Sequence, residues 1–178
     1  MPNPIARLFH RVATGNPRVR AALTPLGPLL MLGLFAGILA LSRAADRAFD
    51  LPALPPRPLN LLLGLPLVLA GAPLVAWSAR RFFAARGTPV PFNPPRELVA
   101  TGPYAHARNP MMTGLFAVLF GVGILRQSPA MVCLVVPAFV ALMYLQIRLV
   151  EEPELELRFG EAYREYRRRT PRFMPRLR

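Results

Sequence analysis

Four stretches of the chain are almost wholly apolar, and polar or proline-rich segments separate them. An α-helix rises about 1.5 Å per residue, so roughly 20 apolar residues cross the hydrocarbon core of a bilayer. The pattern therefore predicts an all-α integral membrane protein with about four transmembrane helices. The predicted spans are residues 22–42, 59–78, 110–125 and 130–150.

The remaining segments predict a basic leader at residues 1–21 and a single membrane domain over residues 22–178. The leader predicts a short surface helix around residues 5–12. Residues 43–58 are polar and proline-rich, which indicates an external connector. Residues 79–109 predict a long polar loop, because its cluster of prolines is incompatible with a regular helix. The first residues of this loop, up to Arg86, are expected to continue the second helix.

The third and fourth spans are separated only by the tight turn at residues 126–129. A connection this short makes them an antiparallel helical hairpin. The helical pattern continues past the fourth span over residues 151–158, and a short C-terminal helix follows over residues 161–169. The hairpin brings residues 104–110, directly before the third span, to the same end as Glu151 and Glu152.

Small residues inside the predicted spans indicate helix packing and no catalytic role. Gly33 and Gly37 form a small-xxx-small pair, which usually marks close helix–helix contact. Gly121 and Gly123 are interpreted in the same way, and Cys133 as a small packing residue.

The basic residues predict how the chain is oriented. All 22 of them are arginines, and the formal net charge is +13. The leader, the loop at residues 79–109 and the tail are rich in arginine, whereas the two opposite connectors are poor in it. The positive-inside rule therefore places both termini and the long loop in the cytoplasm. Because the arginines flank apolar segments, an anionic membrane surface explains the charge better than nucleic acid does.

Several classes of active site find no support in the residues. The two histidines are distant and there is one cysteine, so no metal-ligand set is evident. Neither a Ser-His-Asp set nor a glycine-rich phosphate loop is present. What the hairpin brings together is carboxylates, a guanidinium, a phenol, a proline-rich segment and apolar walls. That mixture fits a zwitterionic or cationic ligand with an apolar part.

An ordered series of short motifs carries a family resemblance. They are Pro91-Phe92-Asn93-Pro94-Pro95-x-x-Leu98-Val99, Gly102-Pro103-Tyr104-x-x-x-Arg108-Asn109-Pro110-Met111, Glu151-Glu152, Arg158-Phe159-Gly160-Glu161-x-Tyr163-x-x-Tyr166 and Thr170-Pro171-Arg172-Phe173-x-Pro175. Over residues 60–176 the series resembles the isoprenylcysteine carboxyl methyltransferase and phospholipid methyltransferase family. The first motif looks like bacterial members of it. Two positions depart from the family pattern, with Met112 in place of the usual Tyr and Ala105 in place of a frequent Arg.

The resemblance implies an integral membrane enzyme that transfers a methyl group from S-adenosylmethionine to a lipid-like or isoprenoid acceptor. It implies a cytoplasmic cofactor pocket without a Rossmann-type fold, in a bacterial inner membrane. The cofactor-binding residues it implies are Arg96, Glu97, Leu98, Val99, Tyr104, Asn109, Pro110, Met111, Met112 and Glu151. It assigns catalytic roles to Arg108 and Glu152, and also carries over Arg148, which lies within one position of an arginine tied to substrate in the protein-carboxyl branch.

Three functions stay open at this point. The first is methyl transfer to the carboxylate or amine head group of a membrane-partitioned acceptor. The second is an NADPH-dependent reduction, because membrane sterol reductases share part of the C-terminal pattern, although they are much longer. The third is a non-enzymatic membrane bundle, which the absence of ionisable residues near the middle of the predicted spans disfavours.

Overall fold

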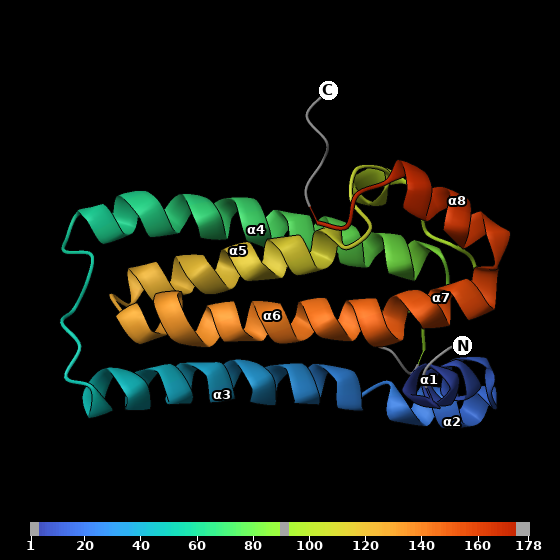
Figure 1. Ribbon diagram of the computed structural model, residues 1–178, viewed down its shortest axis with the longest axis horizontal. Helices are drawn as coiled ribbons and strands as arrows, with labels where there is room; N and C mark the ends of the chain where they lie inside the picture. Colours follow the sequence, from blue (N-terminus) through green and yellow to red (C-terminus); the bar gives the residue numbers. More distant parts are fainter. Residues whose placement is uncertain (1–3, 90–92, 174–178) are drawn as a thin grey trace.

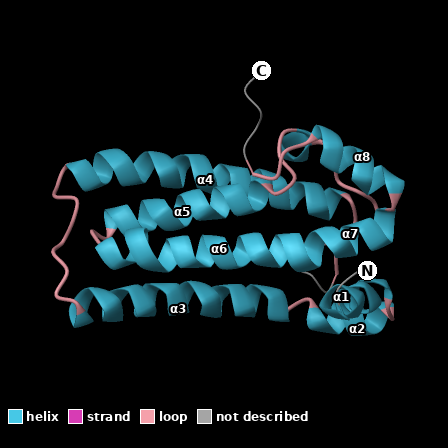
Figure 2. Ribbon diagram, in the orientation of Figure 1, coloured by secondary structure: helices cyan, strands magenta, loops and turns pink. Residues whose placement is uncertain are grey.

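A computed structural model describes residues 4–89 and 93–173, and every regular element in those ranges is helical (Figures 1 and 2). The elements are α1 (Pro4–Thr14), α2 (Pro17–Leu23), α3 (Leu26–Ala48), α4 (Leu59–Ala84), the 3₁₀ turn η1 (Gly102–Ala105), α5 (Pro110–Leu125), the π-helical turn η2 (Met131–Val135), α6 (Val136–Gln146), the π-helical turn η3 (Ile147–Glu151), α7 (Glu152–Phe159) and α8 (Glu161–Arg169).

Four long helices lie side by side in the bundle. They are α3, α4, α5 and the continuous helix from η2 to α7 (Figure 1). Within the described residues, three helices are long and apolar enough to cross a membrane, namely Leu26–Ala48, Leu59–Ala84 and Met131–Phe159. The helix Pro110–Leu125 is also apolar but has only 16 residues. The antiparallel arrangement of α5 and α6 agrees with the predicted hairpin.

Helix α3, which corresponds to the predicted first span, covers Leu26–Ala48 and not residues 22–42. Both predicted boundaries of this span were therefore wrong. The chain turns at Thr24 and Pro25, because a residue before proline disfavours the helical region. At the other end α3 continues to Ala48, because Asp46 faces the turn before η2. Its carboxylate accepts hydrogen bonds from the Ser128 hydroxyl and from the Ala130 N–H at 2.9 Å. The connector therefore begins at residue 49 and not at residue 43.

The other predicted boundaries agree more closely with the structure. The second helix continues through Ala84, as the extension toward Arg86 predicted. The predicted third span and the predicted C-terminal helix coincide with α5 and α8. The leader helix predicted over residues 5–12 lies within α1.

Glycines hold α4 and α5 in close contact, and these two helices pack along most of their length. A Cβ atom on Gly71 would lie 2.5 Å from the carbonyl oxygen of Gly114, and one on Gly114 would lie 2.7 Å from that of Gly71. Gly64 and Gly121 meet one another in the same way further along the pair. Side chains at these positions would push the two backbones apart, so the glycines set the distance between the helices.

Gly33 and Gly37 do not take part in such a contact. Among the described residues, no atom outside their own helix backbone and chain neighbours lies within 4 Å of a Cβ built on either glycine. The predicted packing contact is therefore not found within the described part of the chain. The packing prediction for Gly121 and Gly123 is confirmed, because Gly121 meets Gly64 and Gly123 meets Met131 of η2.

Gly71, which contacts another helix, and Gly37, which does not, allow a matched pair of substitutions. Gly71→Val is expected to destabilise the protein by about 1–3 kcal/mol, because overpacking forces α4 away from α5. Gly37→Val places the same side chain on an uncrowded helix face and should leave the melting temperature unchanged or slightly raised. Thermal unfolding in detergent, followed by circular dichroism, measures both variants. Equal melting temperatures for the two variants would contradict the assigned contact.

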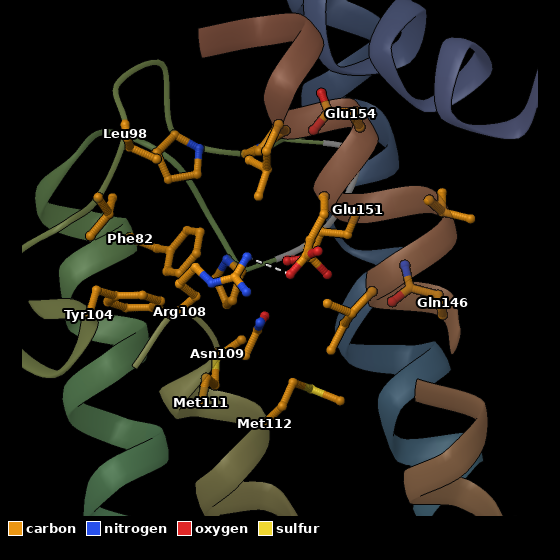
Figure 3. Close-up of a pocket in the computed structure, with 18 of the residues that line it drawn as sticks. Phe82, Leu98, Tyr104, Arg108, Asn109, Met111, Met112, Gln146, Glu151 and Glu154 are labelled. Atoms are coloured by element: carbon orange, nitrogen blue, oxygen red, sulfur yellow. Dashed lines mark hydrogen bonds and ion pairs between the residues drawn. The ribbon is translucent and has the colours of Figure 1, made fainter. Parts of the chain in front are cut away.

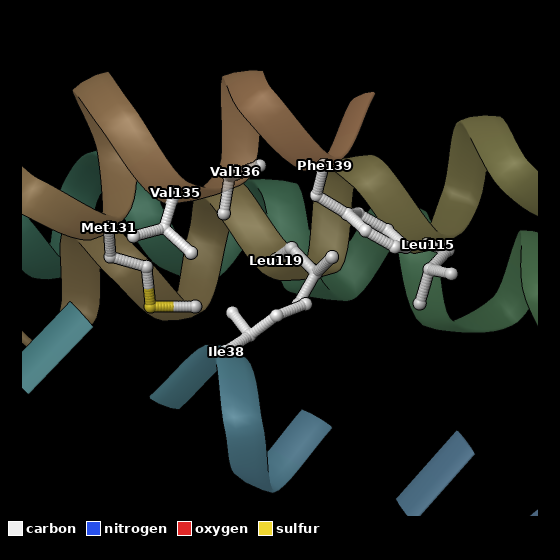
Figure 4. Packing of buried hydrophobic residues seen from close by; sticks show 7 residues of the cluster. All are labelled: Ile38, Leu115, Leu119, Met131, Val135, Val136 and Phe139. Atoms are coloured by element: carbon white, nitrogen blue, oxygen red, sulfur yellow. The ribbon is translucent and has the colours of Figure 1, made fainter. Parts of the chain in front are cut away.

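A cluster of buried side chains from α3, α5, η2 and α6 forms the apolar core (Figure 4). Its members are Ile38, Leu115, Leu119, Met131, Val135, Val136 and Phe139. Ile38 is the residue of α3 in this set, so the core holds α3 through its C-terminal half. The preceding turns of α3 bring Met31 and Leu34 to the cavity described next.

Candidate functional site

A cavity of about 350 Å³ lies beside the loop that joins α4 to α5, and Figure 3 shows part of its lining. Its walls come from α3, α4, α5, α6 and α7 and from the loop that joins α4 to α5. The apolar part of the wall includes Leu115, Phe139 and Met143 of α5 and α6. The charged side chains come from the loop before α5 (Glu97 and Arg108) and from η3 and α7 (Glu151, Glu152, Glu154 and Arg158). The cavity therefore joins a polar end to an apolar interior, as an amphipathic ligand requires.

Most of the residues predicted for the site line this cavity. They are Glu97, Leu98, Val99, Tyr104, Arg108, Asn109, Met111, Met112, Glu151 and Glu152. Three predicted residues do not line it. Arg96 and Arg148 are exposed, and Pro110 is buried in the first turn of α5. The ligand-binding roles of all these residues stay predictions.

The proline-rich segment forms one side of the cavity. Thr88 accounts for its local fold, because both its N–H and its hydroxyl donate to the Asn93 carbonyl, at 2.8 and 3.0 Å. Arg158 of α7 donates from Nη2 to the Pro95 carbonyl and so ties the segment to the opposite wall. Pro91 and Phe92 of the motif lie outside the described residues.

Glu152 is the most heavily paired side chain of the site. Its Oε1 accepts from Arg108 Nη1 at 2.6 Å and from Arg172 Nε at 2.9 Å, and its Oε2 accepts from Arg172 Nη2 at 3.0 Å. The Glu152 side chain is 8% exposed and that of Arg108 is 10% exposed. This carboxylate therefore joins the start of α5, the start of α7 and the C-terminal segment.

The C-terminal segment 170–173 runs beside the residues that precede α5. The Arg108 N–H donates to the Pro171 carbonyl at 2.8 Å, and the Asn109 N–H donates to the Arg172 carbonyl at 2.9 Å. The Thr113 hydroxyl donates to the Phe173 carbonyl at 2.9 Å. The backbone that carries Arg108 and Asn109 is thus fixed by a segment far away in the sequence. The last motif residue, Pro175, lies outside the described residues.

Glu151 and Arg108 both line the cavity, and each carries polar atoms that have no partner among the described residues. In the described part of the chain the Glu151 carboxylate has no hydrogen bond or ion pair, although it lines the cavity. Arg108 Nε is buried, and no described residue accepts a hydrogen bond from it. Figure 3 shows both side chains, together with Asn109, directed at the same space. The site therefore holds one carboxyl group and one buried guanidinium nitrogen that have no partner among the described residues.

The phenols around the cavity are neutral. Burial raises the pKa of Tyr104 well above its usual range, and the neighbouring Glu151 charge adds to the shift. Burial also raises the pKa of Tyr163 to about 12, with a further contribution from Glu152. Tyr166 donates its hydroxyl to the Tyr104 carbonyl at 2.6 Å. These side chains act as hydrogen-bond donors and not as bases at neutral pH.

Several residues of the site were not assigned from the sequence. Phe82 lines the cavity and packs edge-on against Tyr104, with ring centroids 5.3 Å apart. Ile147, Leu155 and Arg158 line it from the same helix as Glu151. Their spacing of about one helical turn would have indicated them as neighbours of Glu151.

The sequence from α4 to the start of α8 identifies the family of this chain. Residues 59–162 match the phospholipid methyltransferase family. The chain belongs to that family. The match covers more than half of the chain and confirms the resemblance stated from the motifs. It supports a membrane methyltransferase and gives no support to the reductase or to the non-enzymatic bundle.

Two curated proteins are similar to part of this chain. The nickel-cobalt-cadmium resistance protein NccN of Alcaligenes xylosoxydans xylosoxydans is 40% identical over 81 residues, which are 46% of this chain and 37% of that protein. The cobalt-zinc-cadmium resistance protein CzcN of Cupriavidus metallidurans is 39% identical over 80 residues, or 45% and 36%. The chain thus matches little more than a third of the length of these relatives. No solved structure matches the chain.

Proposed function

We propose that this chain transfers a methyl group from S-adenosylmethionine to the amine head group of a membrane-partitioned acceptor. The observation that carries the proposal is the cavity that holds both the free Glu151 carboxylate and the free Arg108 Nε. An amino-acid moiety carries an ammonium and a carboxylate, which these two groups complement. A volume of about 350 Å³ falls in the range of small-molecule sites.

The residues present would bind and orient the cofactor and exclude water from it. Glu151 would accept hydrogen bonds from its ammonium, and Arg108 Nε would donate one to its carboxylate. The bound sulfonium would supply the electrophilic methyl group. Because positive charge on sulfur is lost during transfer, apolar walls such as Leu115 and Phe139 favour the transition state over the ground state. Catalysis here is positioning and desolvation.

The balance of charge around the cavity favours an amine acceptor over a carboxylate. Arg108 is paired with Glu152, and Arg158 is paired with Glu154. Glu97 and Glu151 also line the cavity and have no ion pair within the described residues. With Arg172, which shares Glu152, four carboxyl groups stand against three guanidinium groups, so carboxyl groups are in excess. A neutral amine gains positive charge as it attacks the methyl group, and an acidic wall stabilises that charge, whereas it repels a carboxylate acceptor.

The topology completes the proposal. With α5 counted as a short fourth span, the long helices would alternate in direction across the bilayer (Figure 1). The cavity is lined by the arginine-containing loop between α4 and α5. The positive-inside rule then supports a cytoplasmic cavity and cytoplasmic termini. An apolar acceptor would reach the cavity from the bilayer, with its head group at the interface. In a bacterium this membrane would be the inner one.

Radiolabelled methyl transfer tests both the reaction and the acceptor class. Purified protein in detergent, given methyl-labelled S-adenosylmethionine and bacterial lipid extract, is expected to label an amine-bearing lipid. Mass spectrometry should show one added CH₂ unit on its head group. An N-methyl product resists base, whereas a methyl ester releases volatile methanol. Base-labile label would overturn the amine assignment, and NADPH oxidation without methyl transfer would overturn the methyltransferase.

A further inference from the structure

We propose that Arg172, from the C-terminal segment, is a positioning residue that keeps Arg108 Nε available to the cavity. It acts through Glu152 and does not line the cavity itself. The inference rests on the proposed function for its ligand and adds a residue that lies beyond the matched family region 59–162.

The argument begins with the geometry of Glu152. Arg172 makes a two-point contact with this carboxylate, with Nε to Oε1 at 2.9 Å and Nη2 to Oε2 at 3.0 Å. Arg108 reaches only Oε1, through Nη1 at 2.6 Å. Arg172 therefore contacts both oxygens of the carboxylate, and Arg108 contacts one of them. The same Nη1 of Arg108 also donates to the Tyr163 hydroxyl at 3.3 Å.

This division explains why Arg108 Nε is free. An arginine and a carboxylate that meet alone prefer two parallel hydrogen bonds. Without Arg172, Oε2 of Glu152 would have no arginine donor, and Arg108 could turn to bind both oxygens. That rotation would move the guanidinium edge of Arg108 away from the cavity. Arg172 thus prevents an ion pair that would withdraw the free donor from the ligand.

Arg172 is held in place by one contact of its backbone and one of its side chain. Its carbonyl accepts from the Asn109 N–H at 2.9 Å, and its guanidinium lies 4.9 Å from the centre of the Tyr144 ring. The Arg172 side chain is 21% exposed, so its ion pair with Glu152 is partly accessible to solvent. The hydrogen bond to Glu152 raises the pKa of Arg172 above its usual value, so the guanidinium stays charged.

Calorimetric titration of the full-length protein with S-adenosylhomocysteine tests the inference. Arg172→Gln is expected to weaken binding roughly 10-fold, the effect of losing one hydrogen bond to a charged group. Arg172→Lys should recover part of the affinity, because an ammonium can still engage Glu152 at one point. Arg169→Gln is the matched control. Arg169 pairs with Glu165 on exposed α8, and the affinity should not change.

A double-mutant cycle separates positioning from general support of the fold. If Arg172 acts through Glu152, Arg172→Gln should change the affinity less than about 2-fold when Glu152→Gln is already present. Additive losses would overturn the inference, as would equal affinities of wild type and R172Q. Melting temperatures without ligand identify any variant that fails to fold, and R172K then carries the comparison. Failure of the wild-type protein to bind S-adenosylhomocysteine would instead overturn the proposed function.

Discussion

Replacing Glu151 with Gln is expected to weaken the binding of S-adenosylhomocysteine by roughly 10- to 100-fold, the range for a hydrogen bond to a charged group. The substitution keeps the size of the side chain and removes only its charge. Glu151 has no ion pair within the described residues, so its loss releases no buried partner and the fold should be retained. Calorimetric titration in detergent gives the affinity, and circular dichroism reports the fold.

Glu156→Gln provides the control for Glu151. Glu156 lies on α7, where it pairs with Arg164 and Arg167 on the outer surface. Its replacement removes the same charge from the same helix, at a distance from the cavity wall. The affinity of this variant should equal that of the wild-type protein. An unchanged affinity in E151Q, or an equal loss in both variants, would remove Glu151 from the cofactor site.

The sequence could predict the helices because their apolar lengths and their proline and arginine boundaries are local features. The first span was misplaced because its limits depend on contacts that are not local. Asp46 continues α3 only because the turn at Ser128 lies beside it in the folded chain. Likewise, Gly33 and Gly71 sit in similar apolar sequence, and only tertiary packing decides which of them meets another helix.

The end of the bundle that carries the site could also be predicted, because the short turn at residues 126–129 brings the loop before α5 to the level of Glu151. The different environments of Glu151 and Glu152 could not. A π-helical turn, η3, directly precedes Glu152 and inserts an extra residue into the helix. One residue rotates the following side chains by about 100°. A regular helical period therefore cannot tell which of the two carboxyl groups meets Arg108 and Arg172.

The arginines show the same limit. Arg148 was carried over because it lies within one position of a substrate-linked arginine of the family, and the structure places it on an exposed face. Arg172 was part of a quoted motif without a role, and it holds a buried carboxylate. The difference comes from the return of the C-terminal segment to the loop before α5, where Arg108 and Asn109 contact residues 63 positions further along the chain.

Replacing Glu152 with Ala is expected to be the most destabilising change in the site, with a loss of about 3–5 kcal/mol in the free energy of unfolding. The variant leaves Arg108 and Arg172 facing one another without the carboxylate that both now contact. Because the Arg108 side chain is only 10% exposed, its charge is poorly solvated once the carboxylate is gone. Chemical denaturation in detergent micelles measures the loss, and binding of S-adenosylhomocysteine should fall with it.

Two further variants show whether the destabilisation comes from uncompensated charge. Glu165→Ala removes a carboxylate that pairs with Arg168 and Arg169 on the exposed surface of α8, so its unfolding curve should almost match that of the wild-type protein. Arg172→Ala, added to Glu152→Ala, removes one of the two stranded cations and should restore part of the stability. If the double variant is less stable than E152A alone, Arg172 contributes to the fold mainly through Tyr144 and the backbone. The ion pair would then not be the reason for the conformation of this segment.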